Sequence, residues 1–308
     1  MKPQKYVLSV PGDSMYLRAQ VDAAKATADR VGVNLEIFNA EMDAVTQGQQ
    51  LLSVVQSRPE TRPDAILVEP VSASGLPRVA EAAVTAGIAW VVSNGEVDYL
   101  GPLRRNAKVP VFVVSQNHVD VGRIQGKQTG AILPNGGSVL YLRGPAMSWW
   151  ATKRFEGLEN ARPRNVEIKS LKVQGLTEKD AHKAVSSWLS LSRARPEDTQ
   201  LIMAQNADSI LGVMKALETG TSASDRMKWM AIPRAGLGTS NRVRPLVAQG
   251  VLTAAVVTSL TLDKAIEMLA RAMTEGKQPQ EQTYVEAHSY PNLEELAKDG
   301  KLRPAPLH

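Results

Sequence analysis

Residues 110–126, PVFVVSQNHVDVGRIQG, carry the pattern that decides the fold. Residues 111–114 are apolar and mostly β-branched, which predicts a fully buried strand. This strand ends in the polar triplet 115–117, and a helical pattern begins at Asp120, whose charge suits the first turn of a helix. Open α/β sheets bind ligands where polar groups at the carboxyl end of a strand face the start of a helix. The stretch therefore predicts a junction between two similar lobes, with a ligand site beside it.

The same alternation of strand and helix continues on both sides of this stretch. Strands are expected at 6–10, 35–38, 65–68, 89–92, 111–114, 139–142, 166–173, 201–204, 228–232 and 252–257. Helices are expected at 15–31, 45–56, 76–86, 120–133, from 149 onward, and at 178–191, 209–217, 241–249 and 262–273. This alternation predicts parallel sheets joined by right-handed crossovers. The expected fold class is therefore α/β, with two doubly wound parallel-sheet lobes and a ligand cleft between them, which suits a protein that closes on its ligand.

The composition excludes several classes of site and partner. The chain has 308 residues, enough for two domains. It has no cysteine, which excludes disulfides, thiolate nucleophiles and zinc–thiolate sites together. Its net charge is +5 and its pI about 9.3, but basic and acidic residues alternate, which indicates a solvated mixed surface. Aromatic residues make up only 5% and are not interleaved with basic ones, so no nucleic-acid partner is expected.

No segment is expected to insert into a membrane. No apolar run approaches the roughly 18 residues that a spanning helix needs. Strand-like sequence begins at Tyr6, and the stretch before it, MKPQK, contains no apolar leader region. The sequence as printed is therefore that of a cytoplasmic protein, or of a mature domain whose leader has been removed.

The sequence Gly-Asp-Ser-Met at 12–15 is the one enzyme-like signal. It resembles the Gly-Asp-Ser block of a lipase and esterase family whose serine is the nucleophile. Such a serine needs a histidine within hydrogen-bond reach and a carboxylate that orients the histidine. That family places both in an Asp-x-x-His near the C-terminus, whereas a valine and an alanine stand three residues before His288 and His308. A Ser14-dependent ester hydrolase is kept as an alternative to a loop in which Asp13 or Ser14 caps the helix.

No cofactor, metal or catalytic residue is expected. The four histidines, His118, His182, His288 and His308, are not paired at the i,i+3 or i,i+4 spacing that puts two on one helix face. His118 lies at the junction and either lines the cleft or is a solvated residue at the helix start. Residues 236–238, Gly-Leu-Gly, are too short and too late in the chain for a dinucleotide fingerprint, and no phosphate-binding loop occurs. No carboxylate pair stands out.

Polar and aromatic side chains follow several of the expected strands. A concave, mostly apolar pocket with a few hydrogen-bonding groups is the usual design for binding a small molecule. Adjacent helical residues point about 100° apart, so only one of Trp149 and Trp150 is expected to pack, which leaves the other ring to stack on a ligand. The strand-end residues are Tyr16, Asn94, Gln116, Asn117, Trp149, Trp150 and Asn206.

Several motifs in order carry a family resemblance. The triplet 115–117 is Ser-Gln-Asn, residues 154–158 are Arg-Phe-Glu-Gly-Leu, and Ala-Gln-Asn at 204–206 is followed by Leu-Gly at 211–212 and Ala-Leu at 216–217. These resemble the Ser-Asp-Asn, Arg-x-x-Gly-Phe and later motifs of the type I periplasmic substrate-binding proteins, in their ribose- and galactose-binding branch. That branch is related to the ligand domains of lac-repressor-like regulators. The resemblance covers roughly residues 5–285.

The resemblance implies a set of ligand-binding residues. The family's sugar-binding aspartate after the fourth strand is Asn94 here, and its arginine is Thr152. A later aspartate and glutamine correspond to Gly238 and Thr258. Because carboxylates accept stronger hydrogen bonds from sugar hydroxyls than amides do, these departures predict weaker binding of ribose, galactose or glucose. The residues carried over by position are Ser14, Tyr16, Asn94, Asn117, Trp149 and Asn206.

The resemblance also implies where the lobes divide. In the family the chain crosses between lobes three times, and the crossings fall here near Asn117, Thr258 and Tyr284. The implied domains are residues 1–117 with 259–283, and residues 118–258 with 284–308.

The function implied by the family is non-enzymatic binding of a small polar ligand, with carbohydrates as the class that it suggests. The protein would be the monomeric substrate-binding component of an ABC-type uptake system and would meet a membrane permease. The alternative is a ligand sensor that presents its closed form to a signalling partner. The family also implies a periplasmic location once a leader has been removed.

Overall fold

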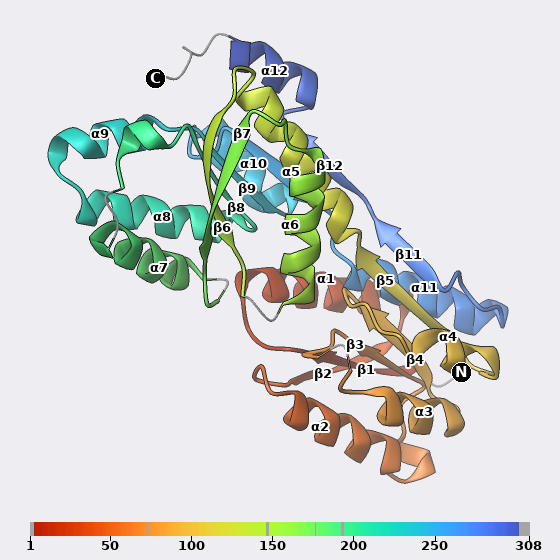
Figure 1. Ribbon diagram of the computed structural model, residues 1–308. Coiled ribbons are helices and arrows are strands. Elements are labelled where there is room, and N and C mark those ends of the chain that lie inside the picture. The colour runs from red at the N-terminus through yellow and green to blue at the C-terminus, as the bar shows by residue number, and fades with distance from the viewer. Residues whose placement is uncertain (1–2, 73, 146–147, 176, 192–193, 302–308) are drawn as a thin grey trace. The chain divides into compact units, whose positions relative to one another are not determined.

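The computed structural model describes residues 3–72, 74–145, 148–175, 177–191 and 194–301. The chain divides into two compact units. Unit 1 takes the described residues of 1–116 and 260–285, and unit 2 takes those of 117–259 and 286–308. Each unit is built on a six-stranded sheet, which confirms the predicted α/β class (Figure 1). No helix in the described ranges is long and apolar enough to cross a membrane.

Unit 1 is a wholly parallel sheet. Its strands lie in the order β2-β1-β3-β4-β5-β11, and each neighbouring pair runs parallel. The strands are β1 (Lys5–Val10), β2 (Asn34–Asn39), β3 (Ala65–Val68), β4 (Ala89–Ser93), β5 (Val111–Gln116) and β11 (Gln282–Val285). The helices are α1 (Met15–Val31), α2 (Ala44–Gln56), α3 (Pro77–Thr85), α4 (Leu100–Arg105) and α11 (Leu262–Glu275), with a 3₁₀ turn at Pro59–Thr61.

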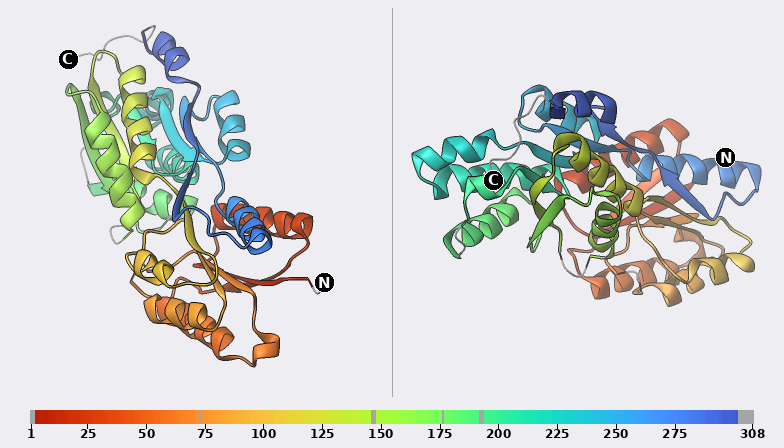
Figure 2. Two further views of the ribbon diagram at one scale, coloured as in Figure 1. Left: turned by 90° about the vertical axis from the view of Figure 1, so that its right-hand side faces the viewer. Right: turned by 45° about the horizontal axis from the view of Figure 1, so that its top comes forward.

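Helices cover both faces of the unit 1 sheet (Figure 2). Tyr6 and Leu8 of β1 face α1 and α11, whereas Val7 faces α2 and α3, because successive strand residues point to opposite faces. A strand that is buried on both sides reads as a continuous apolar run, as Ala-Ile-Leu-Val does in β3. This explains why the unit 1 strands could be predicted from short apolar runs.

Unit 2 repeats the arrangement with one antiparallel strand. Its order is β7-β6-β8-β9-β10-β12, and β12 runs antiparallel to β10. The strands are β6 (Gly137–Arg143), β7 (Val166–Lys172), β8 (Leu201–Ala204), β9 (Arg234–Gly238), β10 (Ala254–Thr258) and β12 (Ala287–Tyr290). The helices are α5 (His118–Ile132), α6 (Trp149–Ala161), α7 (Glu178–Leu191), α8 (Ala207–Gly220), α9 (Ala223–Ala231), α10 (Ser240–Ala248) and α12 (Leu293–Lys301), with a 3₁₀ turn at Pro196–Asp198.

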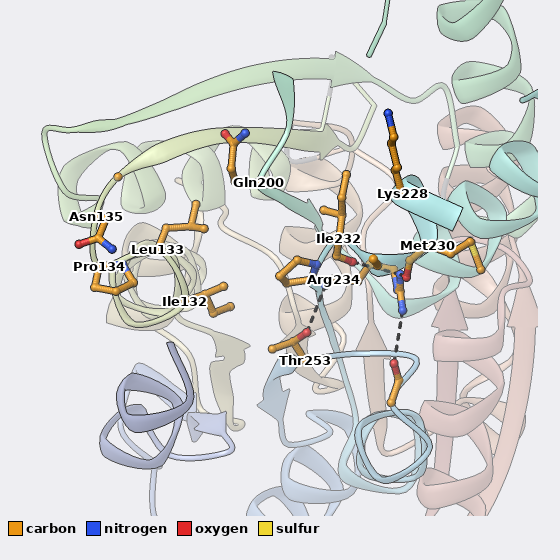
Figure 3. A pocket seen from close by; sticks show the side chains of 14 residues that line it. Ile132, Leu133, Pro134, Asn135, Gln200, Lys228, Met230, Ile232, Arg234 and Thr253 are labelled. Atoms are coloured by element: carbon orange, nitrogen blue, oxygen red, sulfur yellow. Dashed lines mark hydrogen bonds between the residues drawn. The ribbon is translucent and has the colours of Figure 1, made fainter. Parts of the chain in front are cut away.

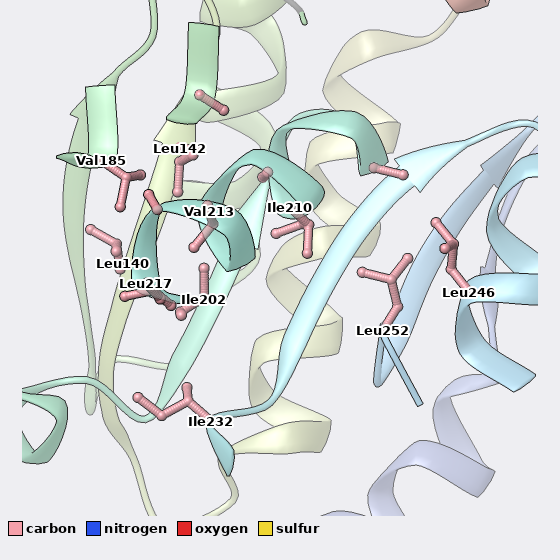
Figure 4. Close-up of a cluster of buried hydrophobic side chains, with 14 of the residues drawn as sticks. Leu140, Leu142, Val185, Ile202, Ile210, Val213, Leu217, Ile232, Leu246 and Leu252 are labelled. Atoms are coloured by element: carbon pink, nitrogen blue, oxygen red, sulfur yellow. The ribbon is translucent and has the colours of Figure 1, made fainter. Parts of the chain in front are cut away.

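The unit 2 core has two sides as well. On one side, Ile210 and Val213 of α8 lie over Leu140 and Ile202 of the sheet (Figure 4). On the other side, α5, α6 and α12 cover alternate residues of the same strands, among them Tyr141. The sheet is therefore held between two apolar layers, and its strand ends stay fixed relative to the helices that follow them.

Helices α5 and α6 pack at backbone contact distance through glycines. A Cβ atom added to Gly122 would lie 1.9 Å from the backbone oxygen of Arg154, and one added to Gly157 would lie 2.0 Å from that of Val119. No side chain larger than hydrogen fits at either position. The close packing brings Arg154 beside the first turn of α5.

Three expectations about elements were wrong. Residues 228–232 are not a strand, since α9 runs to Ala231 and the strand that follows is β9. Helix α5 begins at His118 rather than Asp120, because Asn117 caps it. The second sheet is not wholly parallel, since β12 is antiparallel.

The limits of the units also differ slightly from those that the resemblance implied. Asn117 and Ser259 belong to unit 2, and Tyr284 and Val285 belong to unit 1. Residues 302–308, which include His308, lie outside the described residues.

Candidate functional site

Each unit has a topological switch point, where successive crossovers turn in opposite directions. In unit 1 this point lies between β1 and β3, and in unit 2 between β6 and β8. Doubly wound sheets bind ligands at the carboxyl ends of the strands beside this point. We call the side of a sheet where β1, β3 and β4, or β6 and β8, end its carboxyl edge. In each unit the candidate residues are those of this edge.

Ser14 and Asp13 follow β1, and both serve the start of α1. Ser14 Oγ accepts a hydrogen bond of 3.2 Å from Leu17 N and caps the helix. Asp13 is exposed and pairs with Arg18 at 2.7 Å, which lowers the pKa of its carboxyl. Unit 1 contains no histidine, so Ser14 has no imidazole base within its own unit. The local geometry is that of a helix cap.

Tyr16 belongs to a buried polar network where the chain enters and leaves unit 1. Its hydroxyl accepts hydrogen bonds from Gln20 Nε2 at 2.5 Å and from Gln116 Nε2 at 3.0 Å. Gln20 also bonds Thr261, at the start of α11, and the Thr261 hydroxyl lies 2.8 Å from Ser93 Oγ. The network joins the ends of β4 and β5 to the starts of α1 and α11. It thereby fixes the carboxyl edge of unit 1.

Glu69 and Asn94 follow the neighbouring strands β3 and β4, and they contact each other. Asn94 Nδ2 donates a hydrogen bond of 3.1 Å to Glu69 Oε1. Asn94 has a φ of 51°, a left-handed conformation that asparagine tolerates better than most residues. A Cβ on Gly95 would lie 2.8 Å from Cγ of Pro70, so this glycine allows the two loops to approach. The loops after β3 and β4 are thus held together at the switch point.

The backbone of Glu69 is held from helix α2. Gln47 Nε2 donates to the Glu69 carbonyl oxygen at 3.0 Å and to Ser9 Oγ at 3.1 Å, and Gln47 Oε1 accepts from Val71 N at 2.9 Å. Burial raises the pKa of the Glu69 carboxyl to about 7, although the Asn94 hydrogen bond opposes this rise. Among the described residues, no partner is present for Glu69 Oε2 or Asn94 Oδ1, and both atoms are buried.

At the carboxyl edge of unit 2, Gln205 ties the loop after β6 to helix α6. Its Oε1 accepts from Gly144 N at 3.0 Å, and its Nε2 donates to Ala151 O at 2.9 Å. A Cβ on Gly144 would lie 2.8 Å from the ring of Trp150 and 3.0 Å from Gln205 Oε1, so this loop depends on glycine. The start of α6 is therefore fixed against the end of β8.

His118, Arg154 and the two tryptophans form a compact cluster on this edge. Arg154 Nε donates to His118 Nδ1 at 3.2 Å, and Arg154 Nη1 donates to the Gln205 carbonyl oxygen at 3.1 Å. The rings of His118 and Trp149 meet edge to face at 4.9 Å, and the guanidinium of Arg154 lies 4.9 Å from the ring centre of Trp150. Both tryptophans are half-buried, and each makes one of these two contacts.

The Arg154 contact sets the protonation of His118. Because Nδ1 accepts a hydrogen bond, the proton of the neutral ring is on Nε2. Burial, with the nearby Arg154 charge, lowers the pKa of His118 to about 2. His118 is therefore neutral throughout the physiological range, and its buried Nε2–H lacks a partner in the part of the chain that the structure describes.

Asn117 and Asn206 are both helix caps. Asn117 Oδ1 accepts from Asp120 N at 3.1 Å, and Asn206 Oδ1 accepts from Ser209 N at 2.7 Å. Both side-chain oxygens are therefore engaged in their own helices. Asn206 Nδ2 has no hydrogen bond to another described residue.

Of the six residues carried over from the family resemblance, three lie in each unit. Ser14, Tyr16 and Asn94 lie on the carboxyl edge of unit 1, and Asn117, Trp149 and Asn206 lie on that of unit 2. Sequence reasoning missed Glu69, which directly follows the strand expected at 65–68. It also missed the pairing of His118 with Arg154. The available signal was a lone glutamate directly after an apolar strand, where a buried position is expected.

A cavity of about 560 Å³ lies at the opposite edge of the unit 2 sheet (Figure 3). Leu133 and Asn135 precede β6, and Gln200 precedes β8, so the cavity is at the amino ends of the strands. Arg234 at its wall donates to four backbone carbonyl oxygens. These hydrogen bonds give Arg234 a structural role, and the cavity lies away from the switch point. Among the described residues, no three histidine, cysteine, aspartate or glutamate side chains gather as a metal site.

Comparisons with known proteins agree with this geometry. Residues 6–278 match the family model described as a periplasmic binding protein domain. No curated protein matches the chain.

Solved structures share the fold over almost the whole chain. One is a periplasmic solute-binding protein of an ABC transporter from Actinobacillus succinogenes 130z with bound D-allose, with TM-score 0.77, 17% identity, and coverage of 96% of this chain and 99% of that one. Another is the binding protein of the arabinose ABC transporter from Shewanella sp. ANA-3 with L-arabinofuranose, with TM-score 0.76, 19% identity, and coverage of 97% and 95%. A third is the fructose-binding periplasmic domain of a hybrid two-component system, with TM-score 0.74, 16% identity, and coverage of 97% and 94%.

Proposed function

We propose, on the premise that this chain belongs to the periplasmic binding protein domain family, that it binds a small neutral carbohydrate and closes its two units on it. It would release the ligand unchanged to the permease of an ABC-type uptake system, in the periplasm. The similar structures named above bind sugars, and two of them serve ABC transporters.

The main support for this proposal is that buried polar atoms at both carboxyl edges lack hydrogen-bond partners among the described residues. Unit 1 buries the acceptors Glu69 Oε2 and Asn94 Oδ1, and unit 2 buries the donor His118 Nε2–H. Buried polar atoms are normally satisfied, and an unsatisfied one costs about 1–3 kcal/mol. A molecule with several hydroxyl groups can donate to the first set and accept from the second. Carbohydrates have this chemistry.

A ligand that contacted both units would drive their closure. A ligand shifts a conformational equilibrium only by its difference in affinity for the two states. If hydroxyl groups bind both edges only in the closed form, then ligand favours that form. Small-angle scattering should give a smaller radius of gyration with saturating ligand, and an unchanged profile at saturation would exclude closure.

The binding experiment is a titration of the purified protein with D-allose, L-arabinose and D-fructose, followed by isothermal calorimetry. At least one sugar should bind, and Asn206→Ser should weaken that binding between about twofold and tenfold, the worth of one neutral hydrogen bond. Serine keeps the cap of α8, so the unliganded melting temperature should hardly change. Asn135→Ser, at the amino edge, is the matched control. Absence of binding by every sugar would contradict the proposal.

The proposal includes the absence of catalytic turnover. Ser14 caps α1, and its unit has no histidine. A fluorescent ester should therefore be hydrolysed no faster with protein than without it. Hydrolysis that disappears in Ser14→Ala would restore the esterase alternative.

A sensor is the second candidate, since the fructose-binding domain named above belongs to a two-component system. Transport and sensing share the same binding chemistry and differ in the partner that meets the closed form. Deleting the gene should abolish uptake of the labelled ligand if the protein serves transport. Normal uptake with a lost transcriptional response would favour the sensor.

A further inference from the structure

We propose that the cavity at the amino edge of unit 2 is a second binding site, which takes a small monocarboxylate with an apolar body. The cavity has a volume of about 560 Å³ and lies at the strand ends opposite to the switch point (Figure 3). Binding sites for small molecules have volumes of about 300–1,000 Å³. The inference does not depend on sugar binding, because none of the carboxyl-edge residues described above lines this cavity.

Arg234, in the wall of the cavity, is a buried cation without an acidic partner. The residue is only 8% exposed. Among the described residues, no ion pair includes it, and burial alone lowers the pKa of its guanidinium, with no contribution from a charged side chain. Arginine stays protonated in proteins, whereas buried charges are normally paired with an opposite charge. The wall therefore carries one positive charge that no described side chain balances.

Four backbone carbonyl oxygens hold the guanidinium of Arg234 in place but carry no net charge. Nε and Nη1 donate three hydrogen bonds of 2.7–3.1 Å, and Nη2 donates one of 3.3 Å to Gly250 O. These bonds satisfy carbonyl groups at the ends of α9 and α10, which are the source of the partial negative charge of a helix C-terminus. A guanidinium has five N–H groups, so one Nη2–H is left without an acceptor among the described residues. A carboxylate would accept this hydrogen and would supply the missing negative charge.

The other polar residues of the lining favour an anion with a single charge. Among the described residues that line the cavity, none is an aspartate or a glutamate. The ammonium group of Lys228, the other basic residue of the lining, is already paired with Glu197 at 2.6 Å. The hydroxyl oxygen of Thr253 accepts from Arg234 N at 3.4 Å, and its O–H can still donate to a bound molecule. One unbalanced charge and one free hydroxyl suit a monoanion better than a dianion.

The apolar part of the lining suits the hydrocarbon body of such a ligand. Ile132 and Leu133 come from the end of α5, and Met230 and Ile232 come from the segment that joins α9 to β9 (Figure 3). A ring or a branched chain attached to the carboxylate would remove apolar surface of these side chains from water, which stabilises binding by about 25 cal/mol per Å². The cavity therefore fits an amphipathic carboxylate better than a bare inorganic anion.

The test is NMR of the full chain with ¹³C-labelled methionine methyl groups, without sugar and at constant ionic strength. Benzoate is titrated beside neutral benzamide and beside benzylamine, which is a cation at neutral pH. Met230 lines the cavity, whereas Met227 of the same helix is 74% exposed and does not, so Met227 is the internal control. Single Met→Leu variants at the two positions assign the signals. We expect benzoate to shift the Met230 signal alone, with an affinity at least about fivefold above that of benzamide, because hydrogen bonds to charged groups are stronger.

Arg234→Gln should lower the affinity for benzoate to that for benzamide. Arg226→Gln is the matched control, since Arg226 is an exposed arginine of α9 outside the cavity, and it should bind benzoate as the parent does. Equal affinity for benzoate and benzamide, tighter binding of benzylamine, or no shift of Met230 by any of the three compounds would overturn the inference. Unchanged affinity for benzoate in Arg234→Gln would overturn it as well. The comparison of the three compounds uses the parent protein, so it decides the matter even if Arg234→Gln does not fold, and none of these results bears on sugar binding.

Discussion

The two units share one strand order but bury opposite chemistry at their carboxyl edges. Unit 1 buries a carboxyl group and an amide oxygen, Glu69 and Asn94, with acceptors unmet. Unit 2 buries a guanidinium and an imidazole, Arg154 and His118, and leaves a donor unmet. The two units thus have the same strand order, but the unmet groups are acceptors in unit 1 and a donor in unit 2. In the proposed function, the ligand would donate hydrogen bonds to the unit 1 edge and accept them from the unit 2 edge.

The two edges also differ in their response to pH. Burial shifts both groups toward their neutral forms, raising the pKa of Glu69 to about 7 and lowering that of His118 to about 2. His118 therefore does not titrate near neutral pH, as histidines usually do. The glutamate is the group that changes charge between pH 6 and 8, whereas the histidine stays neutral.

The largest effect on stability should come from disrupting the close packing of α5 against α6, which belongs to unit 2. Gly122→Ala would drive a Cβ against the Arg154 backbone oxygen and should lower the free energy of unfolding by about 3 kcal/mol, because a backbone atom cannot swing away. Gly48→Ala in α2 of unit 1 is the matched control, since nothing lies within 4 Å of its Cβ, and it should stabilise by up to about 1 kcal/mol. Urea denaturation measures both. Equal effects would contradict the packing described for α5 and α6.

Glu69→Gln should change how the free energy of unfolding depends on pH. The folded pKa of about 7 lies above the ordinary value of 4.5, so the folded state retains the proton over this interval and the free energy of unfolding falls as pH rises through it. Because glutamine does not ionise, the Glu69→Gln variant does not lose this stability as pH rises. It should be more stable than the parent at pH 8 by about 2 kcal/mol, with a much smaller difference at pH 5. Urea melts at the two pH values measure it, and a difference that does not grow with pH would show that Glu69 is not buried as described.

The smallest effects should be those of the helix caps, which are alike in the two units. Ser14→Ala and Asn206→Ala should each cost about 1 kcal/mol, since each side chain accepts one backbone N–H. Only Asn206→Ala should also weaken sugar binding. Thermal unfolding with and without ligand separates the two. Loss of sugar binding in Ser14→Ala, with unchanged binding in Asn206→Ala, would contradict the prediction that Asn206 binds the ligand and Ser14 does not.

Much of the fold could be predicted because the signals are local. Apolar β-branched runs such as 111–114 identify strands that are buried on both faces, and alternation with helices fixes the fold class. The strand expected at 228–232 failed because its apolar residues belong to the end of α9. Ser222 and Asp225 form the capping contact of that helix, at 3.2 Å, and could have revealed it.

The candidate site could be predicted only in part, for a physical reason. The caps Ser14, Asn117 and Asn206 are local, because each bonds a backbone N–H three residues on. The pairs Glu69–Asn94 and His118–Arg154 join residues that are 25 and 36 positions apart. Their contact depends on which strands are neighbours and on a glycine-mediated helix packing. No periodicity in the sequence encodes either pairing.

The most direct test of the reversed polarity is an NMR titration of the ligand-free protein. The side-chain carbon of Glu69 and the ring nitrogens of His118 are followed from pH 4 to pH 9, with Glu69→Gln and a His118→Gln variant used to assign the signals. We predict a Glu69 midpoint near 7, and a His118 ring that is protonated only on Nε2 and does not titrate in this range. A Glu69 midpoint near 4.5, or a His118 midpoint near 6.5, would contradict it.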